Sequence, residues 1–281
     1  MLCLAINEGL CRGDAELASL NNTHANRAHY DYMIEEDAVV YGPTGNGYGI
    51  IARLVTECLS KQLIKDTAEH FRTVHGDLSN AGKIVGPGSM MNRERKDHSF
   101  GHVKEVPKSI IQALRANNTY RDHLGWWDKS QAGDRITSCR PTGWSLENPE
   151  VLEAARPLVS EVERVYREEL PEHWARQRDF MNRVHPDYKF NDSVYANVTV
   201  NRNVRTTYHY DNGDFSGGMG NLVVLAGNET GEVVMPRYRI AFRVRPGDVL
   251  LMNVHEMHGN LAFVGERLTA VLYAREHLDK C

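Results

Sequence analysis

The stretch VYANVTVNRNVRTTYHYDNGDFSGGMGNLVVLAG, residues 194–227, marks a change in the character of the chain. Runs of valine, tyrosine, threonine and leucine alternate here with glycine and asparagine, a pattern typical of short strands separated by turns. The same pattern continues to the end of the chain. Seven runs are expected to be strands: VYANVTV, VRTTYHY, NLVVLAG, EVVMP, RIAFRV, DVLLMNV and LTAVLYA. So many short strands in close succession predict a sandwich or a barrel.

The part of the chain before this stretch carries helical signals. Ser60 is a suitable N-cap for a helix over residues 61–74, where apolar residues recur on one side. Asn148 followed by Pro149 is a typical helix start, and the apolar residues after it keep helical spacing. Pro157 is expected to kink this second helix.

Helices followed by strands predict one α+β domain that spans residues 1–281. Within it, residues 1–190 are expected to be mainly helical support and loops, and residues 191–281 to form the β-core. Residues 81–102 read as a loop rich in glycine, arginine and lysine. Basic side chains in and beside this loop could meet phosphates, although a solvated loop is the commoner explanation: they are Lys83, Arg93, Arg95, Lys96, His98 and Lys104.

Composition, charge and cysteine content say more about where the protein is located than about its activity. The chain is 41% hydrophobic, carries a net charge of -4 and has no apolar run long enough to span a membrane. Its first residues lack the basic start of a signal peptide. Five scattered cysteines without a CxxC argue against a disulfide framework and a thiolate zinc site. We therefore expect a cytoplasmic or nuclear protein, and a phage origin is compatible with this.

Histidine and aspartate two residues apart could supply two ligands to a metal, because alternate residues of a strand point the same way. Five such pairs occur: His29-Asp31, His75-Asp77, His185-Asp187, His209-Asp211 and His277-Asp279. Composition alone does not indicate which pair binds a metal, but the expected positions of the strands do. Only the fourth pair lies in the strand-rich region with further histidines and strands downstream.

A non-haem iron site needs two histidines and one carboxylate on one side of the metal. Candidates for the third ligand are His255 and His258 in VHEMHGN, residues 254–260. Nine residues beyond His258, Arg267 begins a run whose alternate residues share a face. Its guanidinium is suited to a carboxylate, and the hydroxyl of Thr269 follows two residues on. A double-stranded β-helix dioxygenase holds the far carboxylate of 2-oxoglutarate in this way.

Three motifs carry a resemblance to a known family. They are NVTVNRNVRTTYHYDNGDFSGGMGNL at 197–222, GEVVMPRYRIAFRVRPGDVLLMNVHEMHGN at 231–260 and ERLTAVLYARE at 266–276. The sequence resembles the TET/JBP dioxygenases, which hydroxylate the 5-methyl group of pyrimidines in DNA. It is most similar to the J-binding-protein and small phage-type branch, and it lacks the cysteine-rich zinc-binding region of animal TET enzymes. The resemblance implies a double-stranded β-helix core of the jelly-roll or cupin type, with N-terminal helices packed on it.

The resemblance also implies roles for individual residues. The matched iron ligands are His209, Asp211 and His258. His258 is favoured over His255, because it has the spacing to Arg267 and the trailing Gly-Asn that are typical of the family. Arg267 and Thr269 match the 2-oxoglutarate clamp, where animal members usually carry serine at the second position. From the residues themselves, Asn197, Thr199 and Asn201 share a strand face, and one of them could bind the near carboxylate; hydrogen bonding at a strand edge explains them equally well.

Three positions match contacts to the target base. Asp214 stands where animal members carry asparagine, Tyr273 matches an aromatic residue that stacks on the flipped base, and Arg275 replaces a histidine of some relatives. By strand parity, Tyr273 and Arg275 share the face of Arg267. Trp126-Trp127 could supply a stacking wedge, but packing is the more common role of such a pair.

The implied activity is hydroxylation of a 5-methylpyrimidine in DNA, and 5-methylcytosine giving 5-hydroxymethylcytosine is favoured. The implied cofactors are Fe(II) and 2-oxoglutarate, with O2 as co-substrate. DNA with an extruded base is the expected partner, because this methyl group is otherwise buried in the base stack. We expect a monomer without membrane contact. The alternatives are a thymine hydroxylase giving 5-hydroxymethyluracil, a dioxygenase of free nucleosides or alkylated bases, a non-catalytic reader of modified bases, and a cupin-type isomerase.

Overall fold

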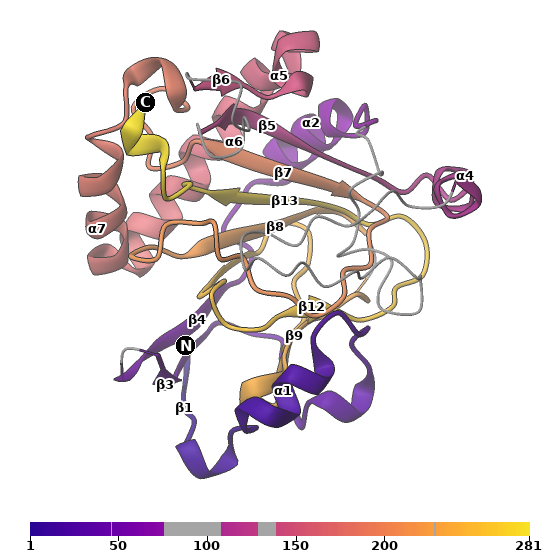
Figure 1. The fold of residues 1–281 in the computed structure, drawn as a ribbon, viewed down its shortest axis with the longest axis vertical. Coiled ribbons are helices and arrows are strands. Elements are labelled where there is room, and N and C mark those ends of the chain that lie inside the picture. Colours follow the sequence, from indigo (N-terminus) through magenta and orange to yellow (C-terminus); the bar gives the residue numbers. More distant parts are fainter. Residues whose placement is uncertain (46, 76–107, 129–138, 228) are drawn as a thin grey trace, which may run out of the picture.

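The structure is a computed structural model that describes residues 1–45, 47–75, 108–128, 139–227 and 229–281. Two β-sheets face each other, and helices cover the outer face of the larger sheet (Figure 1). The basic residues expected at 83–104 lie outside the described residues, as does Asp77 of one histidine–aspartate pair.

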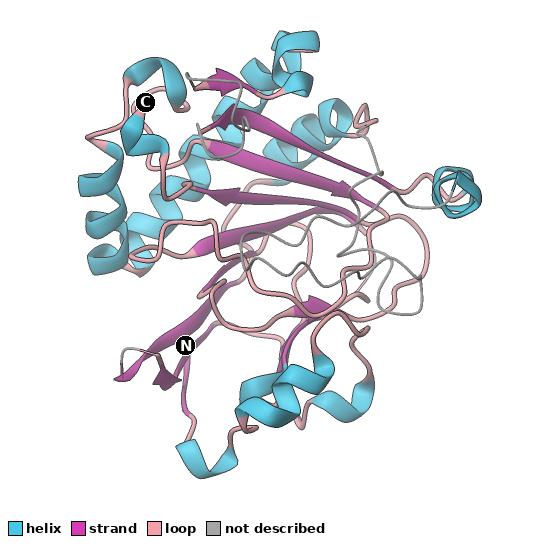
Figure 2. Cartoon of the chain, in the orientation of Figure 1, coloured by secondary structure: helices cyan, strands magenta, loops and turns pink. Residues whose placement is uncertain are grey.

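The larger sheet has nine strands and antiparallel pairing throughout, apart from the parallel pair at its first edge. In spatial order the strands are β1 (Leu2–Ala5), β3 (Ala38–Thr44), β4 (Gly47–Val55), β11 (Val249–Met252), β8 (Gly220–Ala226), β13 (Leu268–Tyr273), β7 (Asn197–Arg202), β5 (Tyr120–Trp127) and β6 (Arg140–Pro141). Strands β8, β13, β7 and β5 lie side by side across the middle of Figure 2.

The smaller sheet has four strands. In spatial order they are β12 (Gly259–Asn260), β9 (Val233–Met235), β10 (Ile240–Phe242) and β2 (Tyr32–Ile34). Its outer face is covered by α1 (Asp14–Leu20), whose Leu17 packs with Val234 and Ala241. The sheet is therefore buried on both sides.

The remaining helices are α2 (Lys61–Phe71), α4 (Lys108–Ala116), α5 (Gly143–Glu147), α6 (Pro149–Glu169) and α7 (Pro171–Met181). Two sequence predictions are confirmed, since the Ser60 side chain caps α2 and Pro149 is the first residue of α6. Helices α2 and α6 pack on each other and against β8 and β11. No helix among the described residues is long and apolar enough to cross a membrane.

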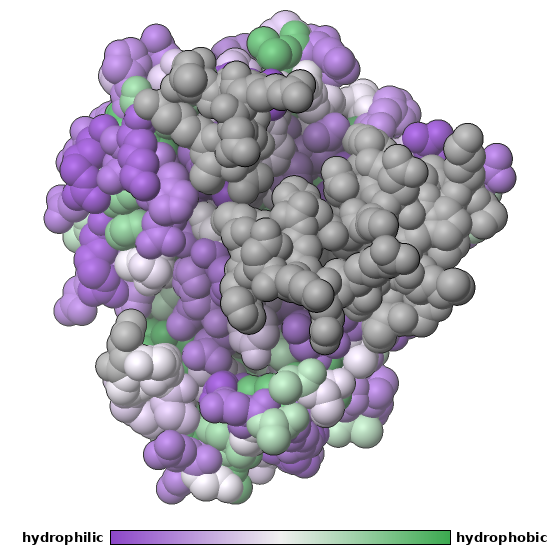
Figure 3. All heavy atoms as spheres, in the orientation of Figure 1, coloured by the Kyte–Doolittle hydropathy of each residue, from purple (hydrophilic) through white to green (hydrophobic). Residues whose placement is uncertain are grey.

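The outer face of the large sheet and the space between the sheets form separate hydrophobic cores. Val198 and Leu272 point outward into the core shared with α2 and α6. Between the sheets, Leu222 and Leu250 pack against Phe242 of the small sheet. On the described surface in Figure 3, hydrophobic residues form small separate groups within a mostly hydrophilic face.

The inner face of the large sheet changes from apolar to polar toward β5. Residues paired in register lie on the same face of a sheet. Here Leu222 lies opposite Val271, Val271 opposite Thr199, and Thr199 opposite His123. The row thus begins in the core between the sheets and ends in polar side chains on β7 and β5. This polar part of the inner face is where the candidate site is built.

The expected division of the chain into helical and β parts is wrong in one respect. Strands β1, β3, β4, β5 and β6 all come from residues before 190, so the β-core is not confined to residues 191–281. Most of β3 and the second half of β4 are buried, including consecutive residues that point to opposite faces. A strand covered on both faces lacks the alternation of apolar and polar residues that identifies a strand in sequence.

One of the seven expected strands is absent. Residues 204–210, VRTTYHY, lie outside the named strands, and isolated bridges hold them: Thr207 to His24, and His209 to His258. The other six runs overlap β7, β8, β9, β10, β11 and β13. The composition of VRTTYHY favours a strand, but it gives no information about whether a neighbouring strand is there to pair with it.

A disulfide joins Cys139 to Cys281, although the scattered cysteines argued against a disulfide framework. Their Cα atoms are 5.6 Å apart, within the usual range for a disulfide. The two residues are separated by 142 positions, so their proximity follows only from the fold. Cys3, Cys11 and Cys58 are free thiols.

Candidate metal centre

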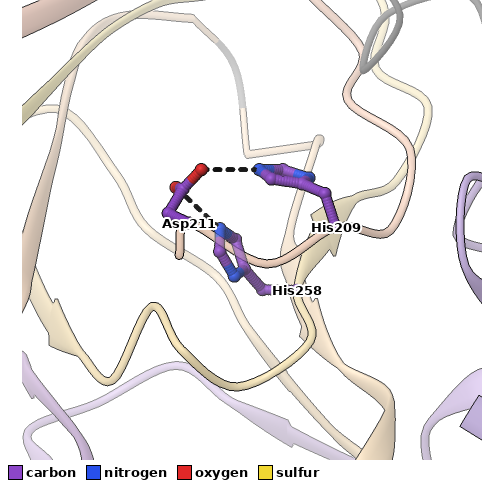
Figure 4. A group of neighbouring side chains, drawn as sticks. All are labelled: His209, Asp211 and His258. Atoms are coloured by element: carbon purple, nitrogen blue, oxygen red, sulfur yellow. Dashed lines mark ion pairs between the residues drawn. The ribbon is translucent and has the colours of Figure 1, made fainter. Parts of the chain in front are cut away.

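His209, Asp211 and His258 converge on one point between the sheets. Each offers one ligand atom, and these atoms all lie within 4.8 Å of one another. The Nε2 atoms of His209 and His258 lie 3.8 and 3.5 Å from the two carboxylate oxygens of Asp211. Figure 4 shows both imidazoles turned toward this carboxylate. Two imidazoles and one carboxylate are the donor set of a non-haem iron site with open positions.

The backbone fixes which nitrogen of each imidazole faces the centre. The Nδ1 atom of His209 lies 2.7 Å from the carbonyl oxygen of Thr207, and that of His258 lies 2.9 Å from the carbonyl oxygen of Glu256. A carbonyl oxygen only accepts, so each Nδ1 carries the proton and donates it. Each Nε2 therefore keeps a lone pair directed at the centre, which is the usual arrangement around metal-bound histidines.

Backbone pairing brings the ligands together from distant parts of the chain. His209 and His258 exchange two backbone hydrogen bonds of 3.0 and 3.1 Å, and the amide of Asp211 donates to the carbonyl of Val254. Gly259 allows this close approach, since a Cβ there would lie 3.1 Å from the backbone of Thr207. The alternative ligand His255 is not part of the cluster.

Arg267 is a buried cation without an ionic partner in the part of the chain that the structure describes. Its side chain makes no ion pair or hydrogen bond with any described residue, and its guanidinium lies 6.0 Å from the ring centroid of Phe263. Burial lowers the pKa of Arg267 to about 10, although the charge of Glu232 opposes this shift. Gly231 provides space for the side chain, because a Cβ there would lie 2.6 Å from Nε. A buried guanidinium of this kind fits a carboxylate ligand.

The polar residues beside Arg267 lie in one row. Thr269, buried on β13, lies opposite Asn201 of β7, which lies opposite Arg121 of β5. The Asn201 amide oxygen and the Arg121 Nε are both buried and have no hydrogen-bond partner. Such unmade hydrogen bonds are costly inside a protein, and a polar ligand in this space would satisfy them.

A second row links β5, β7 and β13 through hydrogen bonds. The Thr199 hydroxyl lies 2.8 Å from the Nδ1 of His123, and the Tyr273 hydroxyl lies 3.2 Å from the same nitrogen. Burial raises the pKa of Tyr273 to about 12, and the nearby charge of Asp214 adds to the shift. Tyr273 therefore stays neutral and keeps its proton. Asn197 lies opposite Tyr273 in register and donates to the carbonyl of Trp126.

Arg275 and Asp214 form the edge of this polar region. A backbone bridge pairs the two residues, and the Nε of Arg275 donates to the carboxylate of Asp128 over 2.8 Å. The two tryptophans that precede Asp128 lie in different surroundings. Trp126 is packed in the outer core, whereas the guanidinium of Arg275 lies 5.9 Å from the ring centroid of Trp127.

Arg121, His123 and Asp128 were not among the site residues predicted from the sequence. All three lie on or just after β5, a strand that was not predicted either. The alternation of polar side chains in YRDHLGWW is weak, and glycine interrupts it. Their place beside Asn201, Thr199 and Arg275 depends on the pairing of β5 with β7.

Comparison with known proteins identifies the family. Residues 126–276, more than half of the chain, match the Tet_JBP family, described as the oxygenase domain of the 2OGFeDO superfamily. The chain belongs to this family. The matched residues include the three residues of the metal cluster and both residues of the expected 2-oxoglutarate clamp.

Several curated relatives of this Tet_JBP chain are named as thymine dioxygenases. It is 32% identical over 151 residues to thymine dioxygenase JBP1 of Trypanosoma brucei brucei, which covers 50% of this chain and 18% of the relative. It is 34% identical over 146 residues to the bifunctional helicase and thymine dioxygenase JBP2 of Leishmania infantum, which covers 50% of this chain and 13% of the relative. The chain thus spans less than a fifth of the length of these relatives.

A solved structure supports the fold. The structure of NgTET1 in complex with 5mC DNA matches with a TM-score of 0.56 and 15% identity, covering 92% of this chain and 84% of the other. This confirms the expected α+β fold with a double-stranded β-helix core. Fe(II), 2-oxoglutarate and O2 are the cofactors that the superfamily implies, and the donor set of the Tet_JBP chain fits them.

Proposed function

We propose that this Tet_JBP chain is an Fe(II)- and 2-oxoglutarate-dependent dioxygenase that hydroxylates the 5-methyl group of a pyrimidine in DNA. The observation that carries the proposal is the convergence of His209, Asp211 and His258 in a chain that also buries the guanidinium of Arg267 with no ionic partner among the described residues. A structural role alone gives no reason to bury that guanidinium without a partner, since this is unfavourable. Iron, 2-oxoglutarate and O2 bound there would supply the oxidising chemistry, with succinate and CO2 as co-products.

The protein's contribution is to bind and to orient. His209 and His258 direct Nε2 at the metal because their Nδ1 protons are held by backbone carbonyls. Arg267 and Thr269 would hold the far carboxylate of 2-oxoglutarate, and Asn201 lies in register with Thr269 to take a further oxygen. The burial of His258, Arg267 and Thr269 excludes water and would strengthen their contacts to a charged co-substrate.

The base would occupy the polar region formed by Tyr273, Asp214 and Arg275. A methyl group inside a duplex is out of reach of a buried metal, so the nucleotide must be extruded or single-stranded. Placing this group beside the metal is the main source of selectivity, because other oxidisable groups are then held away. DNA as substrate would also place the activity in the cytoplasm or the nucleus.

We propose 5-methylcytosine and thymine as the two candidate bases. Asp214 provides an acceptor and Arg275 provides donors. This pair complements the N4 amino group and N3 of 5-methylcytosine, and equally the N3–H and O4 of thymine. The names of the relatives favour thymine.

One reaction tests the proposal. The protein is incubated with Fe(II), 2-oxoglutarate, O2 and DNA that contains both 5-methylcytosine and thymine, and the digested nucleosides are analysed by mass spectrometry. We expect a hydroxymethyl product from one of the two bases and equimolar succinate. Asp211→Ala should abolish the product, because the metal loses its carboxylate ligand.

A matched control is Asp187→Ala, which alters an exposed histidine–aspartate pair with a separation of 3.6 Å. Product formation should stay within about twofold of wild type, since surface ion pairs contribute little. Full activity in Asp211→Ala would refute the assignment of the site. Binding of modified DNA without consumption of 2-oxoglutarate would instead indicate a reader of modified bases.

A further inference from the structure

A buried ion pair connects the end of β5 to the base-binding region. The carboxylate of Asp128 accepts from the Nε of Arg275 over 2.8 Å, and their side chains are only 1% and 10% exposed. Asp128 directly follows β5, and Arg275 lies two residues after β13. The two charges therefore come from strands on either side of β7.

The geometry of the pair leaves part of the guanidinium available. Nε alone donates to Asp128, and neither terminal nitrogen donates to any described residue. One terminal nitrogen lies 3.0 Å from the position that a Cβ on Gly213 would take, so that glycine leaves room for it. The terminal nitrogens of Arg275 lie next to Asp214. They could donate to a base while Nε keeps its contact to Asp128.

Two carboxylates compete for this single guanidinium. Burial alone would lower the pKa of Arg275, but Tyr273, Asp128 and Asp214 together raise it, so the side chain stays charged. Asp128 is the carboxylate to which Arg275 donates a hydrogen bond. Without Asp128, the guanidinium would turn toward Asp214, and a buried salt bridge there would occupy both groups that face the base.

We propose that Asp128 is a positioning residue that holds Arg275 away from Asp214, so that the base meets one donor and one acceptor side by side. This inference rests on the proposed function, because it assigns Arg275 and Asp214 to the substrate base. Asp128 touches neither the metal cluster nor the base in this scheme. It acts by accepting the hydrogen bond from Arg275.

Steady-state kinetics with DNA separate this role from a structural one. Asp128→Asn keeps the size of the side chain but removes the charge. We expect the KM for the DNA substrate to rise about tenfold or more, as is usual when one partner of a buried charged contact is lost. Co(II) binding, followed by its absorption spectrum, should persist, because the metal ligands are untouched.

A double-variant cycle provides the decisive comparison. Arg275→Gln should raise the KM for DNA by a similar factor, and Asp128→Asn should add less than about twofold in that background, since residues that act as one unit are not additive. Glu169→Gln is the matched control. It breaks a partly buried pair between β4 and α6, in which Arg53 lies 2.7 Å from Glu169. It should lower the melting temperature without changing this KM.

The outcomes distinguish the two proposals. If wild type consumes 2-oxoglutarate but oxidises no base in DNA, the proposed function is wrong and this inference fails with it. If wild type oxidises DNA but Asp128→Asn loses only stability, as Glu169→Gln does, the inference alone is wrong. Additive effects in the double variant would likewise overturn it.

Discussion

At the scale of single residues, Arg267 has the most defined chemistry. Its guanidinium is buried, its pKa is lowered to about 10 by burial, and it has no ionic partner among the described residues. Arg267→Lys keeps the charge but replaces a planar fork by a compact ammonium, which cannot bind a carboxylate with two parallel hydrogen bonds. We expect the KM for 2-oxoglutarate to rise by roughly tenfold to a hundredfold, the equivalent of about 1.4–2.8 kcal/mol.

The KM is measured from succinate release at saturating Fe(II). Arg239→Lys is the control, because Arg239 forms an exposed ion pair with Asp31 on the surface. This change should leave the KM for 2-oxoglutarate unaltered. An unchanged KM in Arg267→Lys would exclude Arg267 from the co-substrate site.

At the scale of elements, β5 depends on one glycine. Gly125 has φ of 110°, a conformation that costs other residues about 1–3 kcal/mol, and a Cβ there would overlap the carbonyl oxygen of Ala196. Gly125→Ala should therefore destabilise the protein by at least this amount, because β5 must move away from β7. Since His123 and Asp128 lie on either side of Gly125, the KM for DNA should rise as well.

Chemical denaturation of the two proteins measures the first effect. Gly49→Ala is the matched strand glycine, because a Cβ there meets nothing within 4 Å and its φ is ordinary. Its unfolding free energy should stay within about 0.5–1 kcal/mol of wild type. Equal stability of the two variants would show that β5 does not need glycine at position 125.

At the scale of the whole molecule, the disulfide links two distant parts of the chain. Cys139 precedes β6, and Cys281 ends the chain after β13, so the bond joins the β5–β6 edge to the C-terminal segment. Cys281→Ser should lower the free energy of unfolding by about 2–4 kcal/mol, because the unfolded chain regains the freedom that a closed loop removes.

Thermal melting with and without a dithiol reductant tests this prediction. The reductant should lower the melting temperature of wild type to that of Cys281→Ser and should not affect the variant. Cys3→Ser, which removes an exposed free thiol, should melt like wild type. A wild-type protein insensitive to reductant would show that the bond does not contribute to stability.

The sequence by itself determined the chemistry of the metal centre. The spacing of His209 and Asp211 can be read directly from the sequence. So can the order in which these two residues, a strand, His258 and Arg267 follow one another. Together they predicted the cluster that the fold assembles. The starts of α2 and α6 were also predictable, because the Ser60 cap and the first-turn Pro149 act on neighbouring residues only.

The tertiary structure alone decided which distant residues complete the site. Strand β5 supplies Arg121, His123 and Asp128, the N-terminal strands extend the main sheet, and Cys139 meets Cys281. None of these has a local signal, since pairing between strands depends on register across the sheet and not on neighbours in sequence. A buried strand hides its alternation, and a contact across 142 residues exists only once the chain has folded.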